Sequence, residues 1–500
     1  MNKALNIDKK IFYKYFSKKI GSIIILSCII MLGTLVNSIT PYLFGNIIDA
    51  IVKGQIDQIL KLIKIMFLLE VICAGLSAIE NYYGNKITLK ITYNIKRDII
   101  NKILFINMDN LNKYSKGELI NRVEQDSNEI ASTHISFLTG ILQTFIKGII
   151  SILFAFRISM LLTIISIIYL PLSYLGGMIY KNKLQRFKLS LKEFHDTYLS
   201  FINEILQNIE GIKSYCLENK IALRINDLYK RNLSLSNKYF SVQCGMNGMQ
   251  NILSTILDCV MLLVAAMLIN NKKMTVGSFV SFNQYIRSLL QVFSQVMGYV
   301  MGFISCQVNI DRISRLLNEP IENMNESKTV RLSHIKNIRI NSVFFKYDQK
   351  VILENLNLEI KENGLYSIVG LNGAGKSTLF KIILKLYTIQ SGKIYINDQE
   401  IDSYSISQLR NEISYIAKDP FLFNDTIKFN LTLGKELDEQ YLIEVTRRVG
   451  LLEFISELNN GLNTYIGENG IILSSGTKQK ISIARALIKN TSMWMCDEIT

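Results

Sequence analysis

Gly370-Leu-Asn-Gly-Ala-Gly-Lys-Ser377 is the stretch that decides the fold of the C-terminal part of this chain, because it matches the phosphate-loop pattern G-x-x-x-x-G-K-[ST]. The apolar segment Leu365 to Val369 before it is expected to be a strand, and the periodic segment Ser377 to Leu386 after it a helix. Such a loop lets consecutive backbone N–H groups surround phosphate oxygens, while the lysine neutralises them and the serine hydroxyl can ligate Mg²⁺. We therefore predict an α/β nucleotide-binding domain that takes ATP and Mg²⁺ on these residues: Gly370, Asn372, Gly373, Ala374, Gly375, Lys376, Ser377 and Thr378.

A second motif lies near the end of the chain, where the apolar run Met493 to Cys496 is followed by Asp497 and Glu498. Two acids after an apolar run are often only a strand that meets solvent. In a nucleotide enzyme the same pattern would place Asp497 near Mg²⁺ and Glu498 near the attacking water. The phosphate loop upstream favours this second interpretation, so we predict Ser377 and Asp497 as metal ligands and Glu498 as the catalytic residue.

Between these two motifs, the stretch Leu473-Ser-Ser-Gly-Thr-Lys-Gln-Lys480 precedes a helix-like segment. With it the domain resembles the nucleotide-binding domain of ABC transporters, whose signature is usually written LSGGQ. Ser474 and Gly476 match that signature, whereas Ser475 and Thr477 depart from it. The resemblance implies that Tyr347 stacks on adenine, although an ordinary strand tyrosine is the alternative, and that residues 464–470 touch the transmembrane domain.

Two departures from the family pattern concern hydrolysis. Lys418 stands where the resemblance implies a glutamine that senses Mg²⁺ and the γ-phosphate, and a lysine lacks the amide oxygen that a metal or water would contact. The histidine that the family carries after the catalytic glutamate has no counterpart before the last residue, Thr500, so we expect a domain that is C-terminally incomplete after Glu498. The chain is thus expected to be an ABC-type ATPase whose hydrolytic competence is open.

The chain is too apolar to be wholly soluble, since it is 49% hydrophobic with a mean hydropathy of +0.22. A membrane span needs roughly 20 mostly apolar residues. We predict six spans, of which the second is the weakest because it is short and contains Glu70. Their approximate ranges are 20–41, 62–82, 136–156, 158–179, 248–270 and 276–304.

The net charge of +15 follows this topology. The segments 1–19, 84–132 and 180–243 hold twenty-five Lys and Arg, whereas the alternate loops hold six. By the positive-inside rule the N-terminus lies in the cytoplasm. We therefore expect a multi-pass protein of a bacterial plasma membrane, with its nucleotide-binding domain in the cytoplasm and no nucleic-acid partner. The seven cysteines form no CxxC pair and are expected to be free thiols.

The first 320 residues resemble the six-helix transmembrane unit of ABC exporters. Residues 116–122, with Asp126 after them, are similar to the first cytoplasmic coupling loop, and residues 201–213 to the stretch after the second. The resemblance implies a helical transmembrane domain with cytoplasmic extensions at 1–320, a linker at 321–336 and the nucleotide-binding domain at 337–500.

In the family two such domains face each other, and each ATP lies between the phosphate loop of one chain and the signature of the other. The altered signature favours a heterodimer with a second half-transporter over a homodimer. We expect ATP-driven export of a substrate that the sequence does not identify. The alternatives are a hydrolysis-deficient structural or regulatory subunit that binds ATP, or a non-functional truncated remnant.

Two charges fall inside the predicted spans, Asp258 and Arg287. They lie 14 residues before and 15 residues after Lys272, so at ~1.5 Å per residue both are at a similar depth in antiparallel helices. Charges inside a span usually face a partner or a wet cavity. We expect the two side chains to face each other, either as a structural ion pair or along the translocation path.

Overall fold

The computed structural model describes residues 15–322, 330–362, 364–467, 470 and 473–499. Parts of three sequence predictions lie outside these residues: the lysine-rich N-terminal segment, the middle of the linker and the pair Glu468 and Asn469 in the expected contact loop. The chain forms two compact units. The membrane unit joins Met1–Asn94 to Gln125–Asp311, and the nucleotide unit joins Ile95–Glu124 to Arg312–Thr500.

The membrane unit is built mainly from long helices, of which α4, α8, α10 and α11 have 43 to 53 residues each. Two of them, α4 and α11, run on into the nucleotide unit at their ends. In chain order the helices are η1 (Ser17–Lys19), α2 (Ile20–Asn37), α3 (Thr40–Val52), α4 (Ile56–Phe105), α7 (Ser127–Ile158), α8 (Met160–Gln207), α9 (Ile209–Ser214), α10 (Glu218–Asn270) and α11 (Val276–Asn318).

Length and hydropathy identify five membrane-spanning candidates within the described residues: Ile20–Val52, Ile56–Phe105, Lys116–Ile158, Glu218–Asn270 and Val276–Asn318. The predicted span at 158–179 falls on α8, whose apolar stretch in the described part is the shorter Met160–Tyr169. The predicted span at 158–179 therefore stays a prediction.

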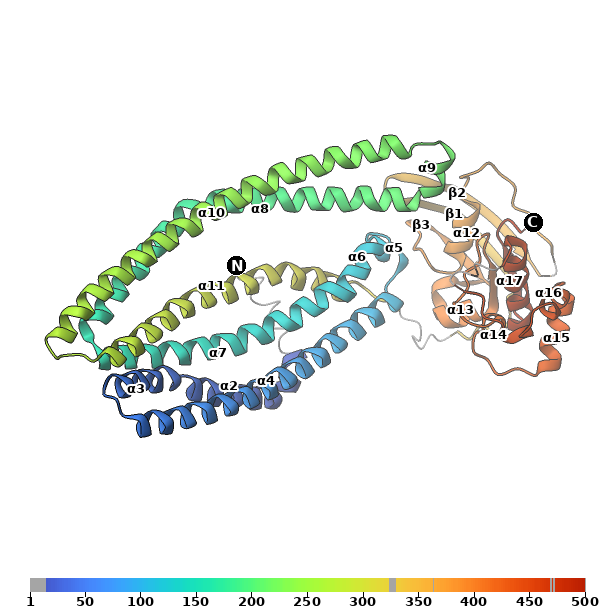
Figure 1. Ribbon diagram of the computed structural model, residues 1–500. Helices are drawn as coiled ribbons and strands as arrows, with labels where there is room; N and C mark the ends of the chain where they lie inside the picture. Colours follow the sequence, from blue (N-terminus) through green and yellow to red (C-terminus); the bar gives the residue numbers. More distant parts are fainter. Residues whose placement is uncertain (1–14, 323–329, 363, 468–469, 471–472, 500) are drawn as a thin grey trace. The chain divides into compact units, whose positions relative to one another are not determined.

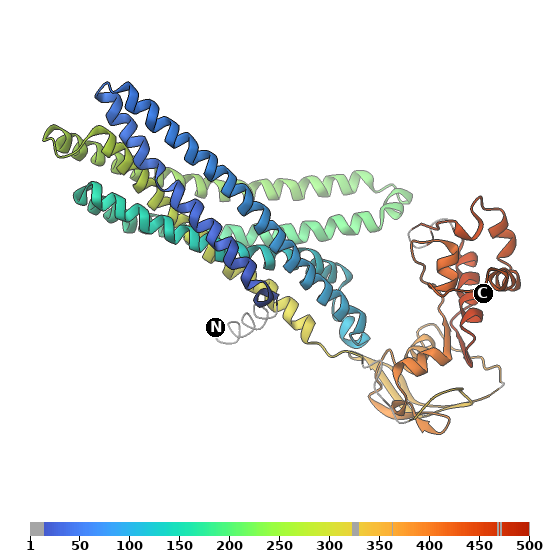
Figure 2. The same ribbon diagram turned by 90° about the horizontal axis from the view of Figure 1, so that it is seen from below.

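Helices α8 and α10 lie side by side in both views of the membrane unit (Figures 1 and 2). Where they meet α11 the contacts are apolar, and the buried residues of this cluster include Leu162, Leu257, Met261, Phe282 and Ile286. Burial of these side chains holds together helices whose outer faces would contact lipid.

The expected contact between the two charged residues of the spans is confirmed. Arg287 Nη2 donates to Asp258 Oδ2 at 3.2 Å, and its Nε donates to Asn283 Oδ1 at 3.0 Å. The Asp258 and Arg287 side chains remain 45% and 66% exposed within this chain. A role of the pair in transport stays a prediction.

The nucleotide unit contains two sheets. Four strands form an antiparallel sheet in the order β2-β1-β3-β4, and β5 pairs with β6 in parallel. The strands are β1 (Asn337–Tyr347), β2 (Lys350–Lys361), β3 (Ser391–Ile396), β4 (Gln399–Glu400), β5 (Ile413–Ile416) and β6 (Met493–Cys496).

Short helices complete this unit, some between α4 and α7 and the others between the strands. They are α5 (Met108–Leu111), α6 (Lys116–Asn121), the π-turn Arg122–Asp126, α12 (Lys376–Ile383), η3 (Ile401–Ser403), α13 (Ile406–Glu412), α14 (Ile427–Thr432), α15 (Glu439–Arg448), α16 (Leu452–Ser456), η4 (Gly461–Asn463) and α17 (Ser475–Lys489). The larger apolar core packs β1 and β3 against α12 through side chains such as Val343, Phe345, Leu379 and Ile396.

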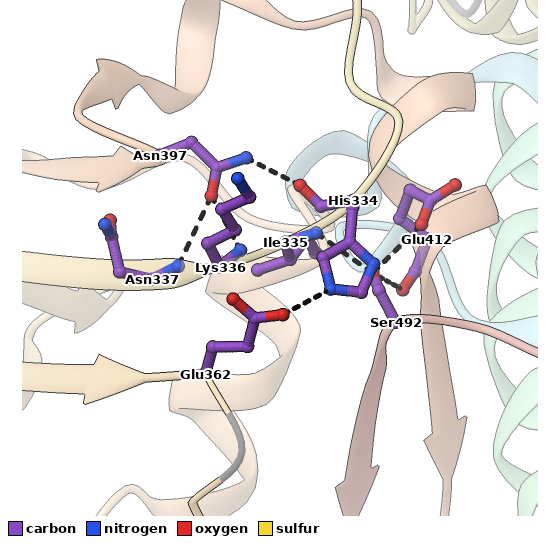
Figure 3. A network of polar contacts seen from close by, with 8 residues as sticks. All are labelled: His334, Ile335, Lys336, Asn337, Glu362, Asn397, Glu412 and Ser492. Atoms are coloured by element: carbon purple, nitrogen blue, oxygen red, sulfur yellow. Dashed lines mark hydrogen bonds and ion pairs between the residues drawn. The ribbon is translucent and has the colours of Figure 1, made fainter.

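A polar network fixes the start of β1 to both sheets (Figure 3). Asn397 accepts from the backbone N–H of Lys336 at 2.7 Å and donates to the His334 carbonyl at 2.6 Å. Ser492, just before β6, accepts from the Ile335 N–H at 3.1 Å. The entry to β1 is thereby held against the β3–β4 turn and the start of β6.

One predicted element is wrong. No strand forms at 365–369: the segment is extended, and Leu365 and Val369 are 102% and 90% exposed. An apolar run becomes a strand only when a neighbouring strand accepts its backbone hydrogen bonds. Within the described residues β6 pairs only with β5, and this segment pairs with neither. The helix expected after the loop is present as α12, which ends before Lys385, whose φ is +51°.

Candidate functional site

The phosphate loop, residues 370–377, leads from the extended segment into α12 and is shaped by its glycines. Gly373 and Gly375 have φ values of +85° and +88°, a region that side chains disfavour. A Cβ on Gly375 would lie 2.8 Å from Leu353 Cδ2, so that position also needs the missing side chain for space. Asn372 and Ala374 are exposed along the loop. The loop therefore presents its backbone, and the first turn of α12 follows directly.

Lys376 folds back over this loop. Its Nζ donates to the carbonyls of Gly370 at 2.8 Å and of Leu371 at 3.1 Å. This position brings the ammonium group to the loop where an anion would add a third partner.

The two predicted metal ligands lie together. Ser377 Oγ donates to Asp497 Oδ1 at 2.9 Å, and Asp497 is buried. The other carboxylate oxygen, Oδ2, accepts from the Tyr415 hydroxyl at 3.0 Å. Burial, together with this bond and the charge of Asp497, raises the pKa of Tyr415. Tyr415 was missed from the sequence, where it is one of several strand tyrosines; it reaches Asp497 because β5 runs parallel to β6.

A hydroxyl and a carboxylate are hard oxygen donors of the kind that Mg²⁺ prefers, and Mg²⁺ is usually held by one or two protein groups plus phosphates. The described residues contain no cluster of three or more His, Cys, Asp or Glu side chains that could hold a metal alone. The donor set therefore fits a magnesium ion that arrives with a nucleotide.

Lys418 and Glu498 form an ion pair. The distance from Lys418 Nζ to Glu498 Oε2 is 2.5 Å, and the side chains are 63% and 44% exposed. The hydrogen bond and charge of Lys418 hold the pKa of the Glu498 carboxyl below its usual value, and Lys376 adds to the effect. The same bond raises the pKa of Lys418. The predicted catalytic carboxylate, Glu498, is thus paired with Lys418, the residue that departs from the family pattern.

Tyr347 lies at the end of β1 among other aromatic rings. Its ring meets Phe345 edge to face at 4.9 Å and Tyr387 at 5.1 Å between centroids. Burial is the main cause that raises its pKa. The side chain is half-buried, and its role as a platform for adenine stays a prediction.

The signature stretch forms the start of α17. Ser474 is the N-cap: its Oγ accepts from the Thr477 N–H at 3.1 Å and shares a hydrogen bond of 2.8 Å with the Thr477 hydroxyl. Gly476 is exposed, and a Cβ there would meet only Ser474 Oγ at 3.9 Å. Within the described part of the chain, no hydrogen bond or ion pair joins Ser474 or Gly476 to the phosphate loop.

Arg485 on α17 is a second residue that the sequence reasoning missed. Its guanidinium donates to the Phe421 carbonyl at 2.7 Å and to Asn430 Oδ1 at 3.0 Å, and it stacks over the Phe421 ring at 4.8 Å. Burial lowers its pKa to about 10. Arg485 therefore anchors the signature helix to the loop that carries Lys418, three residues before Phe421. The helical periodicity around Arg485 gave no sign of this partner.

The polar segment before the expected first coupling loop makes contacts within the nucleotide unit, and the coupling role of residues 116–122 stays a prediction. Asn112 Nδ2 donates to the Tyr387 hydroxyl at 2.8 Å, and the Thr388 N–H donates to Asp109 Oδ2 at 3.3 Å. Both contacts precede the predicted stretch 116–122. Arg122, inside that stretch, instead binds Glu118 and the carbonyl of Arg312. In the sequence, the polar run from Asn107 to Asn112 between two helices was the signal that could have indicated these contacts.

Comparison with known proteins assigns both parts of the chain. Residues 23–295 match the family described as ABC transporter transmembrane region, and residues 353–500 match the family described as ABC transporter. The chain is 27% identical to the provisionally named export ATP-binding/permease protein of Rickettsia typhi, covering 98% of this chain and 87% of the relative. It is 25% identical to the ATP-dependent lipid A-core flippase of Syntrophus aciditrophicus, covering 95% and 79%.

The fold has a counterpart of known structure. The chain resembles a bacterial Atm1-family ABC exporter with ATP bound, with a TM-score of 0.80 and 20% sequence identity, over 95% of this chain and 86% of that one. At this level of identity the likeness concerns the fold.

Proposed function

The chain belongs to the ABC transporter family, and on that premise we propose that it is one half of a dimeric exporter, which uses ATP to move a substrate across the plasma membrane. The observation that carries this proposal is the phosphate loop, with Ser377 and Asp497 joined at 2.9 Å, in a chain whose other part is a set of membrane-spanning helices. We place the transmembrane domain at 1–320, the linker at 321–336 and the nucleotide-binding domain at 337–500.

Each residue of the nucleotide site has a role in this proposal. The loop from Gly370 to Ser377, with Thr378, holds the phosphates through backbone N–H groups, and the Lys376 ammonium neutralises their charge. Ser377 and Asp497 would hold Mg²⁺, which when bound offsets the negative charge of the phosphates. Tyr347 lies against the base.

Glu498 orients the attacking water and accepts its proton, as a carboxylate at this position can do. In the resting arrangement Lys418 competes for the same oxygen, since its Nζ lies 2.5 Å from Oε2. Hydrolysis therefore requires that this ion pair opens. We infer a slow ATPase in the site formed by this phosphate loop.

We propose a heterodimer over a homodimer. Ser474 and Gly476 would serve the ATP held by the partner's phosphate loop, and the neighbouring Thr477 and Ser475 depart from the usual signature. In a heterodimer only one of the two sites would carry this departure, whereas a homodimer would carry it twice. Mixing the purified chain with a candidate second half-transporter tests this: a heterodimer should show more ATPase activity than either chain alone.

The substrate is proposed to be amphipathic. This proposal is supported by a relative named as a lipid A-core flippase and by the exposed apolar faces of the membrane helices.

The test is ATP hydrolysis and substrate movement by the full-length protein in proteoliposomes, with its partner where one is found. Glu498→Gln should lower turnover by roughly 10²- to 10⁴-fold, the usual contribution of a general base, and should leave ATP binding intact. Glu453→Gln, an exposed carboxylate on α16, is the matched control and should change neither. Full activity in the Glu498 variant would refute the assignment.

A further inference from the structure

The membrane unit contains a polar cavity between α2, α4, α7 and α11, with a volume of about 170 Å³. Four of the side chains that line it carry an amide or a charge: Asn37, Glu80, Gln143 and Lys147. All four belong to predicted spans, where polar side chains are costly and usually functional.

Most hydroxyl groups around this cavity are already satisfied. Thr34 and Ser77 donate to carbonyls of their own helices at 2.7 and 2.9 Å, and Tyr285 donates to the Ser38 carbonyl at 2.9 Å. These residues form the wall. The Tyr285 bond also joins α11 to the C-terminal end of α2.

The four amide and charged side chains are different. Within the described part of the chain, Asn37, Glu80, Gln143 and Lys147 make no hydrogen bond or ion pair. Glu80 and Lys147 are half-buried, come from different helices and carry opposite charges. A carboxylate and an ammonium without partners in a membrane span need compensation from water or from a ligand.

We propose that this cavity binds the zwitterionic head group of an amphiphile. The ammonium of the ligand meets Glu80, its acidic group meets Lys147, and Asn37 and Gln143 supply hydrogen bonds. With a volume of about 170 Å³ the cavity suits a small polar head group. The tail would lie along exposed apolar side chains of the same helices, among them Leu35, Ile72 and Phe145.

This inference rests on the proposed export function, because it names the substrate class of that exporter. Binding can nevertheless be measured without ATP. Three probes with one dodecyl chain separate the charges: dodecylphosphoethanolamine carries both, dodecyl phosphate the anion, and dodecylammonium the cation. The full-length protein is placed in nanodiscs of phosphatidylglycerol, and equilibrium binding of each radiolabelled probe is measured.

The zwitterionic probe should bind about tenfold tighter than either singly charged probe, since each charge-assisted hydrogen bond adds a factor of that order. Glu80→Gln should weaken binding of the zwitterion and the ammonium about tenfold and leave the phosphate unchanged. Lys147→Met should weaken binding of the zwitterion and the phosphate about tenfold and leave the ammonium unchanged. Glu70→Gln and Lys90→Gln, exposed residues of α4 outside the cavity lining, are the matched controls and should change nothing.

The double variant Glu80→Lys with Lys147→Glu separates a ligand site from a structural ion pair. It keeps both charges but reverses their direction, so a zwitterion whose tail is joined to its phosphate should bind about tenfold more weakly. Binding equal to the unmodified protein, or no crossover between the single variants, would overturn the inference. If a charge variant fails to fold, Asn37→Ala and Gln143→Ala replace it. Each should weaken binding of the zwitterionic probe and leave binding of the singly charged probes unchanged.

Failure of the export proposal would look different. Head-group selectivity without any ATP-driven movement would leave the cavity assigned and the function refuted. ATP-driven movement of other amphiphiles without selectivity for the zwitterion would support the export function and refute the assignment of the cavity.

Discussion

Replacing Lys418 by glutamine is expected to speed ATP hydrolysis. In the structure the lysine donates to Glu498 Oε2 at 2.5 Å, so the carboxylate that should accept a proton from water is bound to a cation. Glutamine keeps a polar side chain of similar reach but removes the positive charge, and it adds an amide oxygen that can contact a metal or water. The variant therefore frees Glu498 and restores the group that the family resemblance implies.

The size of the effect follows from the exposure of the pair. Both side chains are solvent-accessible, at 63% and 44%, and exposed ion pairs change an equilibrium by at most about fivefold. We therefore expect turnover to rise about two- to fivefold at low salt. Raising the ionic strength from about 0.01 M to 0.15 M shortens the Debye length from about 30 to 8 Å, so salt should speed the unmodified protein more than the variant.

The pH dependence has a defined sign. Lys418 lowers the pKa of Glu498, so the unmodified carboxylate stays ionised to lower pH. In Lys418→Gln that pKa rises towards its usual value of about 4.3. As the pH is lowered from about 6, the rate of the variant should fall at a higher pH than the rate of the unmodified protein, because its general base is protonated earlier.

The assay is steady-state phosphate release by the full-length protein in nanodiscs, with ATP affinity measured in parallel. Lys393→Gln, which removes another exposed lysine–carboxylate pair at 3.4 Å from Glu400, is the matched control and should leave the rate unchanged. A fall in turnover for Lys418→Gln would refute the reasoning. It would mean that the lysine stabilises the negative charge of the phosphates and does not restrain Glu498.

Three further substitutions test other contacts. Gly375→Ala forces a side chain into φ +88° and against Leu353, so it should cost about 1–2 kcal/mol of stability and weaken ATP binding, whereas Gly476→Ala should leave stability unchanged or raise it; denaturant unfolding and nucleotide titration check both. Arg485→Met leaves the Phe421 carbonyl without its donor, removes one donor of Asn430 and should lower the free energy of unfolding by about 1–3 kcal/mol, with added proteolysis around 418–423 as a second readout. Asn112→Ala removes the 2.8 Å bond to Tyr387 and should reduce transport more than basal ATPase activity; equal losses in both readouts would contradict a coupling role. Asn110→Ala removes a bond from the neighbouring Lys113 and should affect neither readout.

The phosphate loop could be predicted from sequence because its requirements are local. Positive φ at Gly373 and Gly375 and a following helix depend on neighbours in the chain, and both are present. The strand at 365–369 could not be predicted in the same way. Its apolar run is equally local, but a strand also needs a partner for its backbone, and this segment has none in the described residues.

Contacts between distant residues were the other limit. Lys418 and Glu498 are 80 residues apart, and each was singled out for a separate reason, without any sign that they meet. Tyr415 reaches Asp497 only because two strands run in parallel. In the membrane unit the depth argument did place Asp258 opposite Arg287, because two consecutive antiparallel helices share one turn. It could not place Glu80 and Lys147 around one cavity, since α4 and α7 are not joined by a single turn.

The altered signature and Lys418, two departures from the family pattern in the ATP machinery, belong to one connected structure. Thr477 lies in the first turn of α17, and Arg485 projects from the same helix two turns later. Through the Phe421 carbonyl and ring, Arg485 holds the loop that begins at Lys418. The half-buried Arg485 guanidinium thus joins the helix that starts at the signature to the loop that carries Lys418. In the proposed dimer the altered signature would serve the partner's ATP and Lys418 this chain's own, so Arg485 links the two departures within one chain.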